Sequence, residues 1–260
     1  VILCGGKGTR LGLLGKKIPK SLIKVQNYPI IWFIIKILKR NSFNHFIIPL
    51  GYKGKFIKKY LKSCEDLKNL NIETVNTGVD TSIAKRIYKI KDKIKSNDFI
   101  LLNGDAILDF NIKKMFAEHI KKNVKMTFLG CEAQLNYGIV GKNKNKIVSF
   151  ERDINFNSIK QKNNKSFVGY VYSGIAIMNK KILKVNFKNF INFEKSFYPI
   201  IIKKYKANLS FISGFWNSVD NMKDVQDLNN IKDRKKVKQI KKIIKKLKKL
   251  KIIFGKIKKF

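Results

Sequence analysis

Short apolar runs alternate with amphipathic segments through the first 130 residues. The runs of strand length cover residues 1–4, 45–50, 72–75, 99–102 and 125–129. Between them, apolar residues recur every three or four positions, which is the period of a helix with one buried face. These helical segments cover residues 30–40, 53–64, 83–95 and 112–122. Strands that alternate with helices predict an α/β fold of the Rossmann-like, doubly wound kind, with a mostly parallel sheet.

The pattern changes near residue 137, where the apolar runs become shorter. Four strand-sized runs follow, at 147–150, 167–172, 175–178 and 209–212. Antiparallel strands need only short connections, whereas parallel strands need a crossover of a dozen or more residues. We therefore expect a small antiparallel insertion that covers a bound substrate.

The last thirty residues combine a narrow apolar stripe with many lysines. The stripe residues recur at steps of three and four: Val237, Ile240, Ile244, Leu247, Leu250 and Phe254. Residues 232–260 carry fifteen Lys or Arg and one acid, which predicts a basic amphipathic helix. We divide the chain into a domain of residues 1–230 and this helix, residues 231–260, and expect the core to be complete without it. Three interpretations of the helix stay open: docking on the body or a second subunit, contact with an anionic membrane surface, or a frayed extension.

The formal charge of +40 comes from 57 Lys or Arg against 17 Asp or Glu. Such a charge attracts polyanions. However, Lys, Asn and Ile are abundant at ordinary surface positions, and their codons are AT-rich. We favour compositional drift for the main body and expect no specific nucleic-acid partner. No run of about 18 uncharged apolar residues occurs, so we expect no membrane-spanning helix.

Cys4, Cys64 and Cys131 are scattered and odd in number, without the spacing of a metal site or a disulfide framework. We interpret them as small, mostly buried apolar side chains. No secretory leader is visible, although the chain starts at Val1. These features favour a reducing cytoplasm, and the basic helix leaves a peripheral position at the inner membrane face open.

Two polar, glycine-marked loops follow predicted strands. Residues 5–10 read Gly-Gly-Lys-Gly-Thr-Arg, and residues 103–105 read Asn-Gly-Asp. Glycines let backbone N–H groups approach phosphate oxygens closely, and the fork of Arg10 suits phosphate. In open α/β sheets, ligands bind beyond the carboxyl ends of the strands, so we expect both loops at one edge. The spacing matches neither the dinucleotide fingerprint nor the Walker loop.

Residues 5–11 (Gly-Gly-Lys-Gly-Thr-Arg-Leu), followed by Pro19-Lys20, resemble the signature of the sugar-1-phosphate nucleotidylyltransferases. The resemblance continues in register over about residues 1–230. Its further segments are 51–53, 76–81, 103–105, 137–140, 149–152, 171–175 and 214–220. The spacing from Trp216 to Asp220, together with residues 76–81, is most similar to glucose-1-phosphate cytidylyltransferases.

This resemblance implies transfer of a nucleotidyl group from a nucleoside triphosphate, here CTP, to a sugar 1-phosphate, here glucose 1-phosphate. It implies four catalytic residues: Arg10, Lys20, Asp105 and Asp220. The implied nucleotide-binding residues are Leu3, Gly5, Gly6, Gly8, Thr9, Arg10, Lys20, Thr81 and Gly104. The implied sugar-phosphate-binding residues, which place the antiparallel insertion on the sugar side, are Tyr137, Gly138, Glu151, Arg152 and Gly174.

The same resemblance implies Mg²⁺ held by Asp105 and Asp220, a homo-oligomer, and a role in nucleotide-sugar and polysaccharide biosynthesis. Physical chemistry agrees with this assignment, because two anionic reactants repel until positive charge screens them, so that catalysis is mostly positioning and electrostatics. Mg²⁺ prefers carboxylate, phosphate and water oxygens.

Two alternatives stay open. The first is the same chemistry with GTP or another triphosphate and heptose or mannose 1-phosphate. The second is a degenerate, non-catalytic protein that binds nucleotides or polyanions. Ala84-Lys85, which stand where the similar cytidylyltransferases have two glycines, motivate both, and the basic C-terminal tail also motivates the second. The intact loop of residues 5–10, with Asp105 and Asp220, argues against the second.

Overall fold

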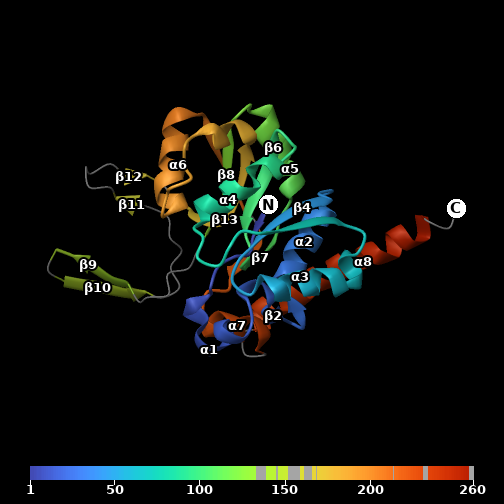
Figure 1. Ribbon diagram of the computed structural model, residues 1–260. Helices are drawn as coiled ribbons and strands as arrows, with labels where there is room; N and C mark the ends of the chain where they lie inside the picture. The colour runs from blue at the N-terminus through green and yellow to red at the C-terminus, as the bar shows by residue number, and fades with distance from the viewer. Residues whose placement is uncertain are drawn as a thin grey trace.

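A mixed, mostly parallel sheet forms the centre of the computed structural model (Figure 1). The structure describes residues 1–132, 139–144, 146–151, 159–160, 166–167, 169–212, 214–230 and 234–257. Five strands lie in the order β1 (Ile2–Leu3), β6 (Asp98–Asn103), β13 (Val171–Asn179), β8 (Met126–Cys131) and β14 (Ala207–Phe211). The parallel pair β4 (His45–Leu50) and β5 (Asn71–Asn76) continues this sheet next to β1, through a parallel bridge between Cys4 and Leu50.

Only β13 runs antiparallel to both of its neighbours, β6 and β8. The pairs β1–β6, β4–β5 and β8–β14 are all parallel. The predicted doubly wound, mostly parallel α/β fold is therefore confirmed.

Helices cover both faces of the sheet. They are α1 (Gly12–Lys17), α2 (Ile30–Arg40), α3 (Gly54–Ser63), α4 (Ile83–Ile90), α5 (Ile112–Lys121), α6 (Phe193–Lys204), α7 (Met222–Asn229) and α8 (Arg234–Ile257). Alternate residues of β6 point to opposite faces, because side chains alternate along a strand. Ile100 and Leu102 join the apolar cluster of α2, α3 and α5, whereas Phe99 and Leu101 join the cluster of α4 and α6.

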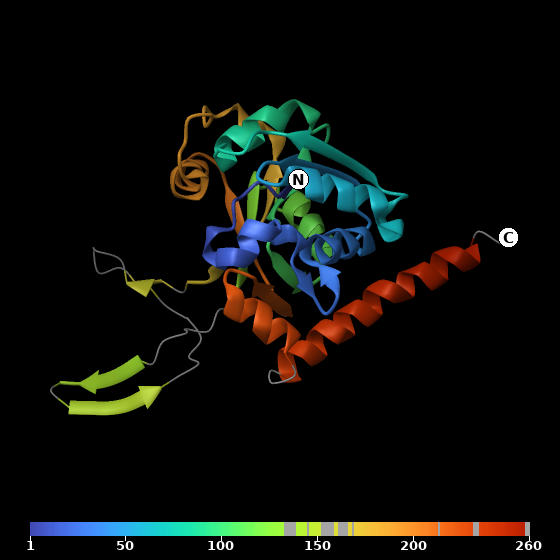
Figure 2. The ribbon, with the colours of Figure 1, turned by 60° about the horizontal axis from the view of Figure 1, so that its bottom comes forward.

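Two predicted strands of the insertion belong to the central sheet instead. Residues 175–178 lie in β13, and residues 209–211 lie in β14. The prediction failed because strand length does not reveal strand partners: Ile175 to Met178 are all buried, as expected for a strand covered on both faces. The antiparallel insertion consists of two pairs: β9 (Ile139–Asn143) with β10 (Lys146–Glu151), and β11 (Ile159–Lys160) with β12 (Ser166–Phe167). The β9–β10 hairpin projects away from the sheet (Figures 1 and 2).

The predicted C-terminal helix exists as α8, but its first half completes the core. Val237, Ile240, Ile243 and Leu247 are buried, and the last three belong to the apolar cluster that contains α2. The expectation that the core is complete without this helix is therefore wrong. The C-terminal end of the helix continues away from the body (Figure 2). Among the described helices, none combines the length and the apolar content that a bilayer crossing requires.

All three cysteines are free thiols, and two of them are buried. Burial raises the pKa of Cys4 to about 12 and that of Cys131 to about 11. Thiols with such pKa values are neutral and unreactive near pH 7. Their interpretation as small apolar side chains is confirmed for Cys4 and Cys131, whereas Cys64 is half-buried.

Candidate active site

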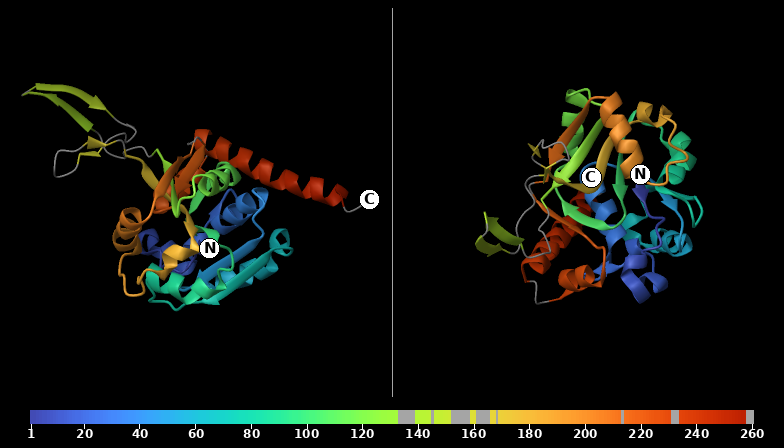
Figure 3. Two further views of the ribbon diagram at one scale, coloured as in Figure 1. Left: turned by 90° about the horizontal axis from the view of Figure 1, so that it is seen from above. Right: turned by 90° about the vertical axis from the view of Figure 1, so that its left-hand side faces the viewer.

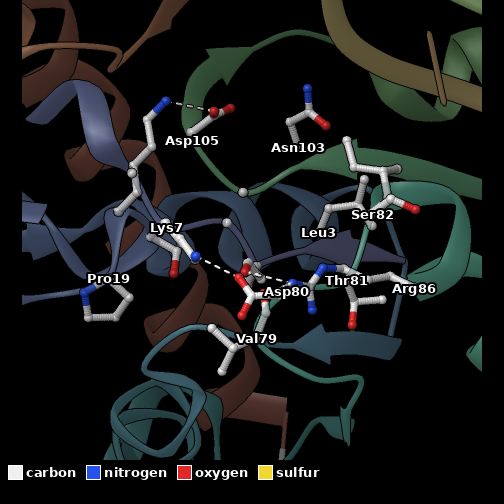
Figure 4. A pocket seen from close by; sticks show the side chains of 18 residues that line it. Leu3, Lys7, Pro19, Val79, Asp80, Thr81, Ser82, Arg86, Asn103 and Asp105 are labelled. Atoms are coloured by element: carbon white, nitrogen blue, oxygen red, sulfur yellow. Dashed lines mark hydrogen bonds and ion pairs between the residues drawn. The ribbon is translucent and has the colours of Figure 1, made fainter. Parts of the chain in front are cut away.

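A cavity of about 550 Å³ opens at the carboxyl edge of the parallel strands (Figure 4). Cavities of this size hold small molecules. Its lining comes from four segments: the glycine-rich loop after β1, the turn after β6, residues 19–21, and residues 79–83 with Arg86. The lining includes these predicted residues: Leu3, Gly5, Gly6, Gly8, Lys20, Thr81, Gly104 and Asp105. The expectation that both glycine-marked loops share one edge is therefore confirmed.

The four predicted catalytic residues lie together beside this cavity. Lys20 Nζ is 2.8 Å from Asp105 Oδ2 and 2.9 Å from Asp220 Oδ1. Arg10 reaches the same Asp220 oxygen at 3.2 Å. Two cations and two carboxylates from distant parts of the chain thus form one cluster.

Strand pairing explains how Asp220 reaches Asp105. Asp105 lies in the tight turn between β6 and β7 (Ala106–Asp109), and Asp220 follows β15 (Phe215–Ser218). β7 and β15 pair antiparallel, and the Val219 N–H donates a 2.9 Å hydrogen bond to the Asp105 carbonyl. Lys20 opens a short 3-10 helix, Lys20–Leu22, after Pro19.

The Asp220 carboxylate is held in its ionised form. Burial alone would raise its pKa, but the hydrogen bond and charge of Lys20, with the Ser218 hydroxyl and Arg10, outweigh burial and lower the pKa below its ordinary value. The Ser218 hydroxyl donates to Asp220 Oδ2 at 2.9 Å, and the Asp220 N–H is held by Asp224 at the start of α7. These contacts therefore favour the ionised form of the carboxylate and hold its orientation.

The donor set also fits a divalent cation. Lys20 Nζ shows that Asp105 and Asp220 converge on a single cationic position. Within the described residues, no group of three or more His, Cys, Asp or Glu side chains could hold a metal. In nucleotide sites, Mg²⁺ is usually bound by one or two carboxylates, and phosphate oxygens and water complete its shell.

Arg86 is a pocket residue that the sequence analysis did not identify. Its side chain is buried. The guanidinium donates hydrogen bonds to the carbonyl oxygens of Leu50, Gly78 and Val79 and to the Thr77 hydroxyl. It also donates to the Gly5 carbonyl at 2.9 Å. One side chain thus ties the glycine-rich loop to the segment on the opposite wall.

The close packing around Arg86 explains two glycines. A Cβ added at Gly5 would lie 2.3 Å from the Arg86 Cζ, and one at Gly51 would lie 2.5 Å from its terminal nitrogens. Real Cβ atoms do not approach heavy atoms so closely, so the guanidinium can sit between these two backbones only because both are glycine. A second tie, an ion pair of 2.5 Å between Lys7 and Asp80, joins the same two segments (Figure 4).

Ala84 and Lys85 do not fill the cavity. Ala84 is fully buried in the apolar cluster of α4, and Lys85 is exposed. The Ser82 side chain caps α4 by accepting from the Lys85 N–H. The first turn of α4 therefore accommodates both side chains, and neither of them lines the cavity.

The sugar-side predictions are only partly placed. Gly174, in β13, has a φ of 81°. A Cβ added there would lie 2.9 Å from Asn103 Nδ2. Gly174 therefore packs against Asn103, the last residue of β6, which lines the cavity. Thr9 is exposed and does not line the cavity. Tyr137, Gly138 and Arg152 lie outside the described residues.

Glu151 is the last residue of β10, and its side chain lies outside the part that the structure describes. Its sugar-binding role stays a prediction. The structure instead places Glu194, in the first turn of α6, beside Asn103 and Asp105. Burial raises the pKa of Glu194, the hydrogen bond from Asn103 opposes this shift, and the charge of Asp105 adds to it. The sequence analysis predicted no helix over α6, and periodicity alone does not show which side chains lie next to a segment in the folded chain.

Residues 1–233 match the family model described as "Nucleotidyl transferase". The chain belongs to this family. It is 28% identical to a probable glucose-1-phosphate cytidylyltransferase of Bacillus subtilis, over 86% of this chain and 92% of that one. It is 30% identical to a D-glycero-alpha-D-manno-heptose 1-phosphate guanylyltransferase of Campylobacter jejuni, over 79% of this chain and 86% of that one.

Among solved structures, HddC from Yersinia pseudotuberculosis superimposes with a TM-score of 0.66 at 20% identity, over 87% of this chain and 96% of that one. This likeness supports the fold. In this family member, two cations, Arg10 and Lys20, and two carboxylates, Asp105 and Asp220, lie together beside the glycine-rich loop.

Proposed function

We propose that this enzyme is a sugar-1-phosphate nucleotidylyltransferase that transfers CMP from CTP to glucose 1-phosphate. The observation that carries the proposal is the position of Lys20 between Asp105 and Asp220, with Arg10 beside them, at the mouth of the glycine-rich cavity. The similarity to a probable glucose-1-phosphate cytidylyltransferase supports the choice of CTP and glucose 1-phosphate.

In the reaction, a phosphate oxygen of the sugar phosphate attacks the α-phosphorus of the triphosphate. The new P–O bond forms as the bond to the β-phosphate breaks, and pyrophosphate leaves with the electron pair. Arg10 and Lys20 offset the charge of the triphosphate, and the N–H groups of residues 5–8 orient it. No side chain needs to form a covalent bond, so the protein contributes position and charge.

Asp105 and Asp220 are the residues that would hold Mg²⁺. The ion would supply positive charge to the phosphates. Lys20, which neutralises both carboxylates here, would then pair with phosphate oxygens instead. Asp105 and Asp220 thus serve as the ligands, and Lys20 as a cation shared between protein and substrate.

A second candidate is the same transfer from GTP to heptose or mannose 1-phosphate. The 30% identity to a heptose 1-phosphate guanylyltransferase favours it. Pyrophosphate release should be measured for four triphosphates, each with glucose, mannose and heptose 1-phosphate, in Mg²⁺. CTP with glucose 1-phosphate should give the highest kcat/KM. A preference for GTP would select the second candidate, and no release with any pair would favour a non-catalytic binding protein.

We infer further that the enzyme works in the cytoplasm, where its product would feed polysaccharide synthesis, and that it forms a homo-oligomer. Free thiols and nucleotide substrates support the cytoplasm. The edge strand β14 exposes Leu209 and Phe211, and Tyr170 packs on Phe211, which supports a contact with a second copy. Size-exclusion chromatography with light scattering measures the molar mass of the protein in solution. The mass of a monomer would contradict the homo-oligomer.

A further inference from the structure

Helix α8 is fixed to the body along one face only. Val237, Ile240, Ile243 and Leu247 form this face, and they pack in the core. Lys246 Nζ pairs with Asp109 at 2.6 Å, and Lys248 lies over the Tyr28 ring. The helix therefore has a defined direction relative to the sheet.

The opposite face of α8 is made of exposed lysines. At 3.6 residues per turn, Lys238, Lys241, Lys242 and Lys245 fall within an arc of about 100°, whose centre lies about 155° around the helix from the centre of the buried face. All four are exposed. No acidic residue occurs from Arg234 to the end of the chain, so nothing on the helix itself neutralises this face.

The end of α8 extends past the rest of the molecule (Figure 2; Figure 3, left). The sequence of this end combines lysines with large apolar residues: Leu250, Ile252, Ile253, Phe254 and Ile257. A nucleic acid binds basic surfaces through its phosphates, and aliphatic side chains contribute nothing to that electrostatic contact. An anionic bilayer surface attracts the lysines and takes up the apolar residues at its interface.

We propose that α8 is an arm that binds the enzyme to membranes containing anionic lipid. Its docked half sets its direction, its lysine face contacts the lipid headgroups, and its projecting end enters the interface. Because the lysine face lies opposite the docked face, the helix can lie flat on a bilayer with the body on the far side. This surface is separate from the nucleotide cavity, so the proposal goes beyond the proposed function.

Two variants of equal net charge test the lysine face. The first changes Lys238, Lys241, Lys242 and Lys245 to Gln. The matched control changes four exposed lysines of α3 to Gln: Lys55, Lys58, Lys59 and Lys62. Sedimentation with vesicles of phosphatidylglycerol and phosphatidylcholine, in about 0.1 M salt, measures the partition coefficient of the full-length protein.

The α8 variant should lose at least about 100-fold in partitioning, because each basic residue near an anionic surface contributes about fivefold. The α3 variant should lose less than about fivefold, which is the effect of one such residue. Both variants should keep the wild-type rate of pyrophosphate release without vesicles. Equal losses in the two variants would show that net charge alone matters and would overturn the proposal, as would wild-type protein that does not bind these vesicles.

A truncation after Lys248 tests the projecting end, because it keeps the docked half. It should weaken vesicle binding without lowering the melting temperature. Unchanged vesicle binding would show that the projecting end does not enter the membrane interface, and that part of the proposal would be wrong. Duplex DNA serves as the competing partner. If the α8 variant loses DNA binding but keeps vesicle binding, the helix binds nucleic acid and the membrane proposal is wrong.

Discussion

Replacing Arg86 with lysine keeps one positive charge but removes the fork that joins two walls of the cavity. Arg86 donates to five acceptors: the carbonyls of Gly5, Leu50, Gly78 and Val79, and the Thr77 hydroxyl. A lysine carries three N–H donors on one nitrogen and cannot span both walls. The Gly5 and Leu50 carbonyls also accept from the Tyr52 and Thr77 N–H groups. The part-buried Gly78 and Val79 carbonyls would therefore lose the donor that Arg86 supplies.

Each hydrogen bond to a charged donor contributes about 1.5–3 kcal/mol, and water can replace part of this at a part-buried acceptor. We expect Arg86→Lys to lower the free energy of unfolding by about 2–4 kcal/mol, a fall in Tm of about 5–15 °C for a chain of this length. The KM for the triphosphate should also rise more than kcat falls, because the loops that Arg86 joins line the nucleotide cavity without taking part in bond making. Urea unfolding followed by circular dichroism, and initial rates, measure the two effects.

The matched control is Arg234→Lys, which makes the same change at an exposed helix start. It should leave both quantities unchanged. An Arg86→Lys protein with a free energy of unfolding within about 0.5 kcal/mol of wild type, the usual range for surface changes, and an unchanged KM would refute the role given to Arg86. A double-mutant cycle adds a geometric check: Gly5→Ala should cost less stability in an Arg86→Ala background, because the added Cβ would otherwise meet the guanidinium.

Three further changes test the site and the core. Asp105→Asn should abolish pyrophosphate release while the far-UV spectrum stays native, since it removes a charge with little change in shape; near-normal turnover in Mg²⁺ would contradict the metal role. Arg10→Lys should slow turnover at least about tenfold, or about 1.4 kcal/mol of barrier, and full activity would exclude contact with reacting phosphates. Ile240→Ala should lower the free energy of unfolding by about 2–5 kcal/mol, whereas Lys238→Ala should not; equal effects would show that α8 is not part of the core.

The period of apolar residues predicted secondary structure correctly where the residues of a segment themselves determine it. The predicted helix 30–40 and the predicted strand 45–50 match α2 and β4 in their bounds. The glycine-rich loop and Asp105 were found because a phosphate site needs particular residue types at short spacing. These features depend on neighbours in the sequence.

Features that depend on distant partners were missed. The residues of β13 and β14 show strand patterns, but nothing in them says that they join the central sheet. The apolar stripe predicted that Ile244 lies on the buried face of α8. In the structure Ile243 is buried and Ile244 is half-buried. The angle at which the helix packs on the body decides which side is buried, and the sequence does not show this angle. The roles of Arg86 and Glu194 come from loops and strand ends that only the folded chain brings together.

Helix α8 covers part of the apolar surface of α2, although it is made much later during synthesis of the chain. Ile30 to Leu38 are all buried in the finished protein, and part of their cover is Ile240, Ile243 and Leu247, some two hundred residues later. At about 5–20 residues per second, a ribosome needs about 10–40 s to make the intervening chain. During that time a helix that is apolar on nearly every side has no C-terminal partner. Until α8 has been made, the nascent chain therefore exposes the apolar surface of α2 that this helix covers in the folded protein.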